Sequence, residues 1–292
     1  MGRLPAFATR SAPQHSGPSP IQALNTTCEG LWLLQALCGI ETLPSVLVLR
    51  PYVADVGPPS AHPGLDILRE AGALVAGQDR VVHPQIAQWL EALGAPDVVL
   101  CAMISRGNSH LRVAIARRGT LTVAAARHGD EITVENIGAV PSMRSLLARL
   151  LPLCGPEQRP AEFDPIMVPS SELLDGLAQV VRGDHTPKVA LSRLGLNATQ
   201  QRVMIAAADQ PQAEMSIAVI RHDHRGDHVG VAAVAITDTA EGRVVTGPVR
   251  SESGAWWSMI TPGTPAAGAS ALDSLLQTVG LTSWNVHTRD AS

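Results

Sequence analysis

The sequence predicts an α+β fold made by a pseudo-two-fold duplication, in which each half holds an antiparallel β-meander, a helical bundle and a closing helix. The first observation is a helical seam that occurs twice with the same relative spacings of 0, 3, 4 and 7. The two seams consist of Met143, Leu146, Leu147 and Leu150, and of Leu272, Leu275, Leu276 and Val279. Residues at these spacings stack on one face of a helix, so each seam predicts a helix that packs on a sheet. The second observation is that about four strand-like segments precede each seam.

The positions of the two seams predict how the chain is divided. Residues 21–155 are expected to form an N-terminal half and residues 156–284 a C-terminal half, joined through the Pro-rich segment 151–161. Residues 1–20 are rich in Pro, Ser and Ala and are expected to form a flexible tail, and residues 285–292 a second tail.

The elements of the N-terminal half are predicted from local signals. These signals are Pro at the start of a helix, Gly after its end, and alternation of apolar and polar residues in a strand. They predict a short strand at 21–28, a helix at 29–38, a strand at 46–50, helices at 62–71 and 83–93, strands at 98–104, 111–117, 121–127 and 131–135, and the closing helix from Met143. The turns between the last four strands carry the Gly, Asn and Asp that tight turns need.

The first meander is also expected to have a low apolar face made of small side chains. Its members are Ala114, Ala116, Ala124 and Ala126. A helix of this chain or of a partner can cover such a face.

The C-terminal half repeats the same kinds of element. The signals predict an apolar run at 165–168, a helix capped by Ser170 or Ser171 and ending near 181, helices at 187–194 and 197–208, strands at 214–222, 228–237, 242–249 and 256–261, and the closing helix at 265–279. Short strands in blocks, with helices before and after them, favour an α+β fold over alternating parallel βα units.

Composition and charge exclude several classes of function. Hydrophobic residues make up 45% of the 292 residues and charged residues 16%, which predicts a sizeable core. The formal net charge of -4 gives no basic surface for nucleic acid. The longest apolar run, residues 98–104, is too short for membrane insertion, so the chain is expected to be soluble and cytoplasmic. Its four cysteines form no CxxC pair and are expected to be buried, reduced thiols.

The densest polar cluster, residues 221–228 (RHDHRGDH), raises a possible enzyme function. His222, His224 and His228 are residue types that bind zinc or nickel, as in a metal-dependent hydrolase. However, the cluster is expected at the tip of a hairpin, where the neighbouring groups that orient metal-bound imidazoles by hydrogen bonds are lacking. The sequence has no P-loop, no GxGxxG after a strand and no GxSxG. We therefore expect no catalytic residue, metal or cofactor. A structural homodimer with paired strand edges is a further alternative.

Several segments, in order, resemble the EspG family of mycobacterial type VII (ESX) secretion systems. Residues 26–53 (TTCEGLWLLQALCGIETLPSVLVLRPYV) resemble the start of these proteins, and residues 62–75 (HPGLDILREAGALV) the next helix. Residues 113–134 (VAIARRGTLTVAAARHGDEITV) resemble the first meander. Residues 236–245 (ITDTAEGRVV) and 258–267 (SMITPGTPAA) resemble the second half.

This resemblance implies a function and a binding surface. Members of the family are cytosolic chaperones without catalytic activity, which bind the helical tip of the PPE subunit in PE–PPE heterodimers, keep it soluble and deliver it to the type VII secretion machinery. The family's contact surface combines the central sheet, the loop after the first meander strand and the C-terminal helical bundle. That loop is short here, whereas some members carry a long extension. The implied partner-binding residues are Arg106, Gly107, Asn108, Ser109, His110, Arg112, Leu194, Leu196, Arg202 and Met204.

Overall fold

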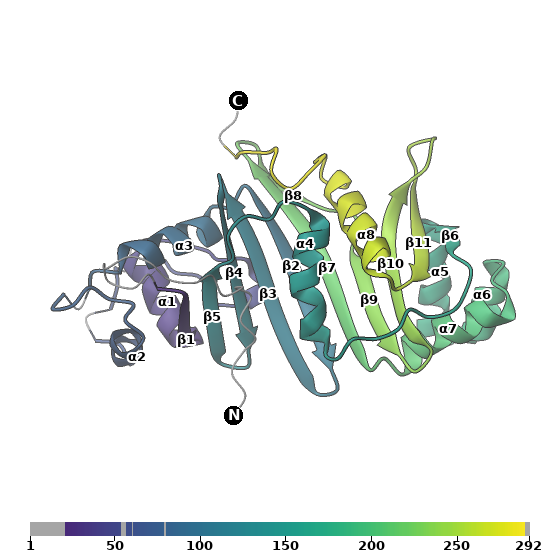
Figure 1. Cartoon of the computed structure of the whole chain (residues 1–292), viewed down its shortest axis with the longest axis horizontal. Coiled ribbons are helices and arrows are strands. Elements are labelled where there is room, and N and C mark those ends of the chain that lie inside the picture. The colour runs from purple at the N-terminus through teal and green to yellow at the C-terminus, as the bar shows by residue number, and fades with distance from the viewer. Residues whose placement is uncertain (1–20, 54–56, 60, 79, 290–292) are drawn as a thin grey trace.

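The computed structural model describes residues 21–53, 57–59, 61–78 and 80–289, so the tail predicted at 1–20 lies outside the described residues. One antiparallel sheet runs through the molecule with helices on both faces (Figure 1). Its strand order is β1-β5-β4-β3-β2-β7-β9-β10-β11-β6, with β8 paired to β7. The predicted mixture of helices and antiparallel strands is confirmed.

The elements follow one another in a regular series. The strands are β1 (Ala23–Thr27), β2 (Val98–Arg106), β3 (Ser109–Arg118), β4 (Leu121–His128), β5 (Glu131–Asn136), β6 (Ile166–Pro169), β7 (Ala213–Asp223), β8 (Gly226–Val229), β9 (Val234–Thr239), β10 (Gly242–Arg250) and β11 (Trp256–Pro262). The helices are α1 (Cys28–Leu37), α2 (Gly64–Glu70), α3 (Pro84–Gly94), α4 (Met143–Leu150), α5 (Ser170–Val181), α6 (Pro187–Arg193), α7 (Ala198–Asp209) and α8 (Pro265–Gln277), with short 3₁₀ helices η1 (Ser45–Leu47) and η3 (Leu151–Cys154). None of the helices in the described residues is long and apolar enough to cross a membrane.

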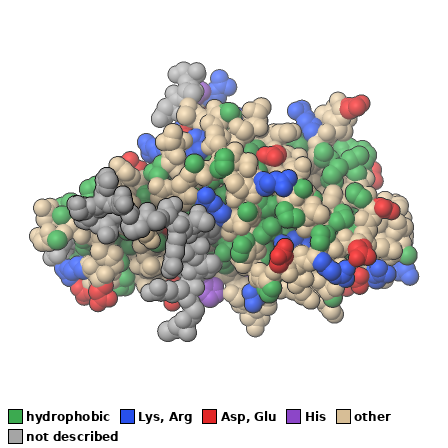
Figure 2. Space-filling model, in the orientation of Figure 1, with side chains coloured by type: hydrophobic (Ala, Val, Ile, Leu, Met, Phe, Trp, Pro, Cys, Tyr) green, Lys and Arg blue, Asp and Glu red, His purple; other side chains and the backbone are tan. Residues whose placement is uncertain are grey.

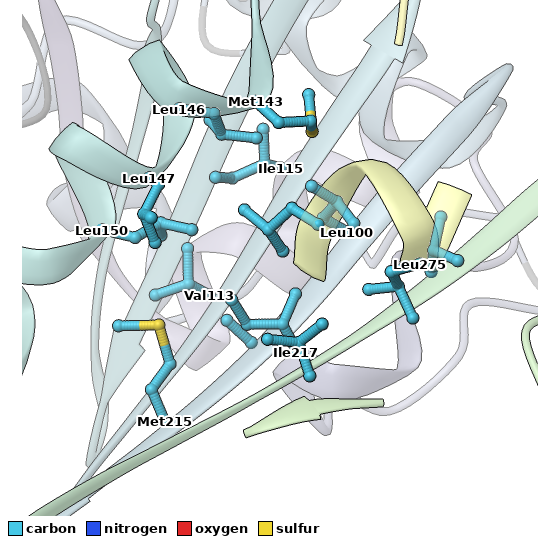
Figure 3. Packing of buried hydrophobic residues seen from close by; sticks show 14 of the residues in the cluster. Leu100, Val113, Ile115, Met143, Leu146, Leu147, Leu150, Met215, Ile217 and Leu275 are labelled. Atoms are coloured by element: carbon cyan, nitrogen blue, oxygen red, sulfur yellow. The ribbon is translucent and has the colours of Figure 1, made fainter. Parts of the chain in front are cut away.

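The front face of the sheet in Figure 1 is covered by α4 and α8. Figure 3 shows how the first seam packs there: Leu146, Leu147 and Leu150 of α4 lie over Ile115 and Val113 of β3. The predicted seams are buried, since Leu150 and Leu275 are 0% exposed. A Cβ at Gly268 of α8 would lie 2.6 Å from the Leu147 side chain, so glycine permits the close approach of the two helices.

The described residues cover the opposite face, which we call the far face, at its two ends. At one end α1, α3 and η1 contribute to a core that includes Leu31, Trp89 and Leu90. At the other end α6 and α7 pack with β6, β10 and β11 around Leu191 and Val203. Figure 1 shows these two helical groups at opposite ends of the long axis.

The strand predicted at 46–50 is wrong. This segment forms η1, followed by Val48 in the left-handed region at φ 49°. A Val in this conformation is a backbone outlier. The Arg127 guanidinium donates hydrogen bonds to the carbonyls of Leu47 (2.6 Å) and Val48 (2.5 Å), so a side chain satisfies groups that a neighbouring strand would otherwise pair.

The strand predicted at 228–237 is also wrong, because it is two strands, β8 and β9, interrupted at Gly230. A Cβ at Gly230 would lie 2.7 Å from the Thr278 hydroxyl, so the chain passes close to the end of α8 at this point.

Neither Ser170 nor Ser171 caps α5 as predicted. The preceding Pro169 is the cap residue, and the Ser170 hydroxyl hydrogen-bonds to that of Ser258 (3.0 Å).

The predicted single face of alanines is wrong as well. Ala114 lies opposite Ala125, and Ile115 opposite Ala124, in the antiparallel register of β3 and β4. Residues directly opposite each other share a face. Ala114 and Ala116 therefore face the core under α1 and α3, whereas Ala124 and Ala126 face α4.

The segment after α8 returns across the sheet to the N-terminal half. Trp284 is 2% exposed, and Asn285 donates a hydrogen bond to the Val140 carbonyl (3.0 Å). The sequence offers no partner for His287, but its Nε2 donates to the His222 carbonyl (2.6 Å), and Arg117 donates to the His287 carbonyl. The end of the described chain is therefore tied to both halves.

Candidate partner-binding surface

In the part of the chain that the structure describes, the middle of the far face is open between the two helical groups. One row of directly opposed residues crosses it through six strands, and we call it the cross-sheet row. It runs Arg127, Arg112, Met103, Ser216, Ala235 and Thr246. Met103 is 49% exposed, and the other five are half-buried. Small side chains at Ser216 and Ala235 keep the floor of this surface low.

The β2–β3 turn stands at the edge of this surface. Arg106 pairs with Ser109, which leaves Gly107 and Asn108 as the turn residues. Gly107 has φ 55°, and a positive φ at the first turn position is typical of the type II′ hairpin turn. The whole segment from Arg106 to His110 is exposed. The turn is short and tightly paired, as the sequence predicts.

The predicted residues of this turn point in different directions. A Cβ at Gly155 would lie 3.0 Å from Arg106 Nη1, so the Arg106 guanidinium lies against the segment that follows η3. Arg112 belongs to the far face, and its Nη1 lies 3.5 Å from Met103 Sδ. His110 Nδ1 hydrogen-bonds to Ser105 Oγ (3.1 Å), which holds its ring beside β2.

A groove of about 340 Å³ lies between the β2–β3 and β4–β5 turns, and we call it the turn groove. It is lined by Val48, Asn108, His110, Arg112, Arg127, His128 and Gly129. His128 Nε2 hydrogen-bonds to Ser109 Oγ (3.0 Å), which ties the two turns together. No local pattern in the sequence points to Val48 and Arg127, because their contact joins segments about 80 residues apart.

The remaining predicted residues lie in the C-terminal helical group. Leu196 is 6% exposed and packs in its core, and Leu194 and Met204 are half-buried against that core. Arg202 has a 61% exposed side chain, and its Nε lies 3.4 Å from Glu241 Oε2 in the β9–β10 turn. The structure therefore brings Leu194, Leu196 and Met204 together, with Arg202 at the margin.

Helix α5 carries an exposed apolar stripe that is not among the predicted site residues. Leu174, Leu177 and Val181 lie at spacings 0, 3 and 7, on one helix face, and are 64%, 49% and 87% exposed. Their spacing was visible in the sequence, but periodicity alone does not say whether a stripe is covered. We call these three residues the α5 stripe.

The histidine cluster lies at the β7–β8 tip, where two of its imidazoles contact aspartates of the same tip. His222 Nδ1 lies 2.5 Å from Asp227 Oδ1, and His228 Nε2 lies 2.8 Å from Asp223 Oδ2. The Arg225 backbone N–H, and then His228 and Arg221, lower the pKa of Asp223. Among the described residues no group of three or more His, Cys, Asp or Glu is arranged to hold a metal ion. The hydrolase alternative has no support in this geometry.

The four cysteines are free. The expectation that all four are buried is wrong, since only Cys154 is buried and Cys28, Cys38 and Cys101 are half-buried. Burial raises the pKa of Cys38 and of Cys101 to about 11, and that of Cys154 to about 12. Burial, assisted by Asp130, also raises the pKa of Cys28. Thiols of this kind are protonated at neutral pH and are poor nucleophiles.

Comparison with known proteins gives consistent matches over most of the chain. A sequence model of the EspG family matches residues 27–274. The chain is 29% identical to the ESX-5 secretion-associated protein EspG5 of Mycobacterium tuberculosis, over 91% of this chain and 97% of that protein. It is 28% identical to the ESX-2 secretion-associated protein EspG2 of the same species, over 87% and 94%.

The fold also matches a solved structure. The chain resembles the Mycobacterium tuberculosis type VII secretion system chaperone EspG5, solved in complex with a PE25–PPE41 dimer. The TM-score is 0.79 at 25% sequence identity, covering 91% of this chain and 100% of that chain.

Proposed function

Because the chain belongs to the EspG family, we propose that it is a cytosolic chaperone and adaptor of a type VII secretion system, without catalytic activity. In this proposal it binds a PE–PPE heterodimer through the PPE subunit, keeps that subunit soluble and delivers it to the secretion machinery. The observation that carries the proposal is the structural likeness to EspG5, which extends over the whole of the EspG5 chain. That protein was solved with a PE–PPE dimer.

The open far face suits this role. A helical tip with exposed apolar residues aggregates unless it is covered. A surface with a low floor and raised ends accepts such a helical element. The cross-sheet row supplies the floor, and the two helical groups stand at its ends. The proposed contact residues are those from Arg106 to His110 together with Arg112 on one side, and Leu194, Arg202 and Met204 on the other, with Leu196 supporting them from the core.

We also propose that the scaffold arose by duplication, with halves 21–155 and 156–284 and terminal segments 1–20 and 285–292. The strand orders support this: β1-β5-β4-β3-β2 in one half parallels β6-β11-β10-β9-β7 in the other. In each half an outer strand leads into helices, and a closing helix follows the last meander strand. The central pair β2 and β7 then joins the halves. Pairing of strand edges between two copies stays a prediction.

Co-expression with cognate PE–PPE pairs, followed by size-exclusion chromatography, tests the function. We expect a complex with one copy of this chain per heterodimer. Failure with every cognate pair would overturn the proposal.

A matched pair of variants tests the surface. Ser216→Arg places a long cation in the middle of the cross-sheet row and should abolish the complex. Ser270→Arg makes the same change at an exposed position of α8, the helix that covers the front face of the sheet. This variant should leave the complex intact. Equal binding by both variants, with unchanged thermal unfolding, would move the site away from the far face.

A further inference from the structure

The turn groove has the chemistry of a site for an acidic side chain. Its lining residues include two arginines and two histidines and no carboxylate. The Arg112 guanidinium contacts the thioether of Met103 and has no carboxylate partner among the described residues. Glu214 lies on the same face, but β2 stands between it and His110. The Asp130 carboxyl lies close enough to Cys28 to help raise the pKa of that thiol.

The second arginine of the groove has a different task. Arg127 donates to the carbonyls of Leu47 and Val48 and, through Nε, to that of Gly129 (2.9 Å). These bonds hold Val48 in its left-handed conformation, with its side chain 58% exposed at the groove. Arg127 is therefore a positioning residue: it fixes an apolar contact and adds positive charge, while the Arg112 guanidinium donates only to the Met103 thioether among the described residues.

Apolar side chains flank the available cation. Val48 lines the groove, and Met103 lies opposite Arg112 on β2, just outside the groove lining; both are exposed. Figure 2 shows the opposite, front face, where hydrophobic side chains gather over β10 and β11 and basic side chains are scattered. On the far face, Arg112 and Arg127 instead stand next to each other at one end of the cross-sheet row.

We propose that the turn groove is a specificity pocket that receives an acidic side chain of the client's helical tip. The client carboxylate pairs with the planar guanidinium of Arg112, and an apolar client residue beside it packs on Met103 and Val48. The pocket is continuous with the open surface, since Arg112 and Met103 belong to the same row. This inference rests on the proposed function.

Charge reversal at Arg112 tests the pocket. The affinity of a cognate PE–PPE pair is measured by calorimetry for the full chain and for Arg112→Glu, Arg112→Gln and Arg112→Lys. The matched control is Arg118→Glu, the same change at an exposed position at the other end of β3. We expect at least tenfold weaker binding for Arg112→Glu, an intermediate loss for Arg112→Gln, and binding within twofold of the parent for the control. Added salt should weaken parent binding more than Arg112→Glu binding.

The outcomes separate this proposal from the function it rests on. If the parent binds no cognate pair, the proposed function fails. If the parent binds and both Arg112→Glu and Arg112→Gln bind equally well, only the pocket proposal is overturned. A reciprocal change in the client, an acidic tip residue replaced by Arg, should restore binding to Arg112→Glu; failure of every such change would also overturn the pocket. Thermal unfolding of each variant confirms that it is folded.

Discussion

The two helical groups on the far face differ in how they are held. In the N-terminal group α1 buries six residues and α3 five, among them Leu31 and Trp89. In the C-terminal group α5 buries none and α7 only Val203. Both groups flank the same surface, but the helices of the first group bury many apolar residues, whereas α5 and α7 of the second group bury few. Local opening costs least where few apolar contacts are buried. We infer that the N-terminal group is a rigid wall and the C-terminal group an adaptable one.

Removing the largest anchor of the rigid wall should have the greatest effect. Trp89→Ala leaves a cavity at a side chain that is 2% exposed, and we expect the free energy of unfolding to fall by about 3–5 kcal/mol. Denaturant unfolding measures this. Val203→Ala, the deepest side chain of α7, should cost roughly 1–2 kcal/mol, because only two methyl groups are lost. Equal losses would contradict the comparison.

The N-terminal half also holds the end of the described chain through a buried ion pair. Arg117 Nη1 lies 3.0 Å from Asp97 Oδ2, and Asp97 also accepts from the backbone N–H groups of Gly119 and Arg289, each at 2.7 Å. Arg117→Gln should cost roughly 3 kcal/mol, the low end for a broken buried pair, because those two donors remain.

Hydrogen exchange gives this prediction its second readout, since amides of residues 285–289 should lose protection together with the ion pair. Arg118→Gln is the matched control; it changes an exposed neighbour on β3 and should shift stability by no more than about 0.5 kcal/mol. Unchanged stability of Arg117→Gln would mean that the pair does not anchor this segment.

Elements set by local spacing were predictable from the sequence, and those set by distant contacts were not. The Leu146 and Leu275 seams follow from residues three and four apart, and the Gly107 turn from one glycine. Val48 adopts its conformation because of Arg127, and His287 finds its partner on β7, so no local pattern reports either. For the candidate site, the family resemblance indicated the hairpin and the C-terminal helices, but it could not tell that Leu196 is buried and the α5 stripe exposed.

Alkaline pH should weaken the rigid wall before the adaptable one, because Cys38 lies in the former and α5–α7 contain no cysteine. The raised pKa of Cys38, about 11, means that the folded state holds the thiol proton more tightly than the unfolded state. Its stabilising contribution is complete below about pH 8.5 and is lost as pH rises through the folded pKa. At pH 10 we expect the loss to be roughly 1 kcal/mol, less than the full linkage because the thiol is partly exposed.

Urea unfolding of the parent and of Cys38→Ala at pH 8 and pH 10 isolates this contribution. The variant should lose less stability between the two pH values than the parent does. An equal loss in both proteins would assign the alkaline sensitivity to other groups.

We expect the smallest change in stability for substitutions in the α5 stripe. These substitutions test whether the C-terminal helical group contributes to client binding. Leu174 and Leu177 are exposed, so the double change Leu174→Ser and Leu177→Ser should alter the free energy of unfolding by no more than about 0.5 kcal/mol per site. If the stripe covers part of the client, affinity for a PE–PPE pair should nevertheless fall about tenfold, which corresponds to about 1.4 kcal/mol. Val229→Ser, a 63% exposed apolar residue of β8, is the control and should change neither quantity. A loss of stability without a loss of affinity would show that the stripe supports the fold, and the two walls would then differ in packing but not in purpose.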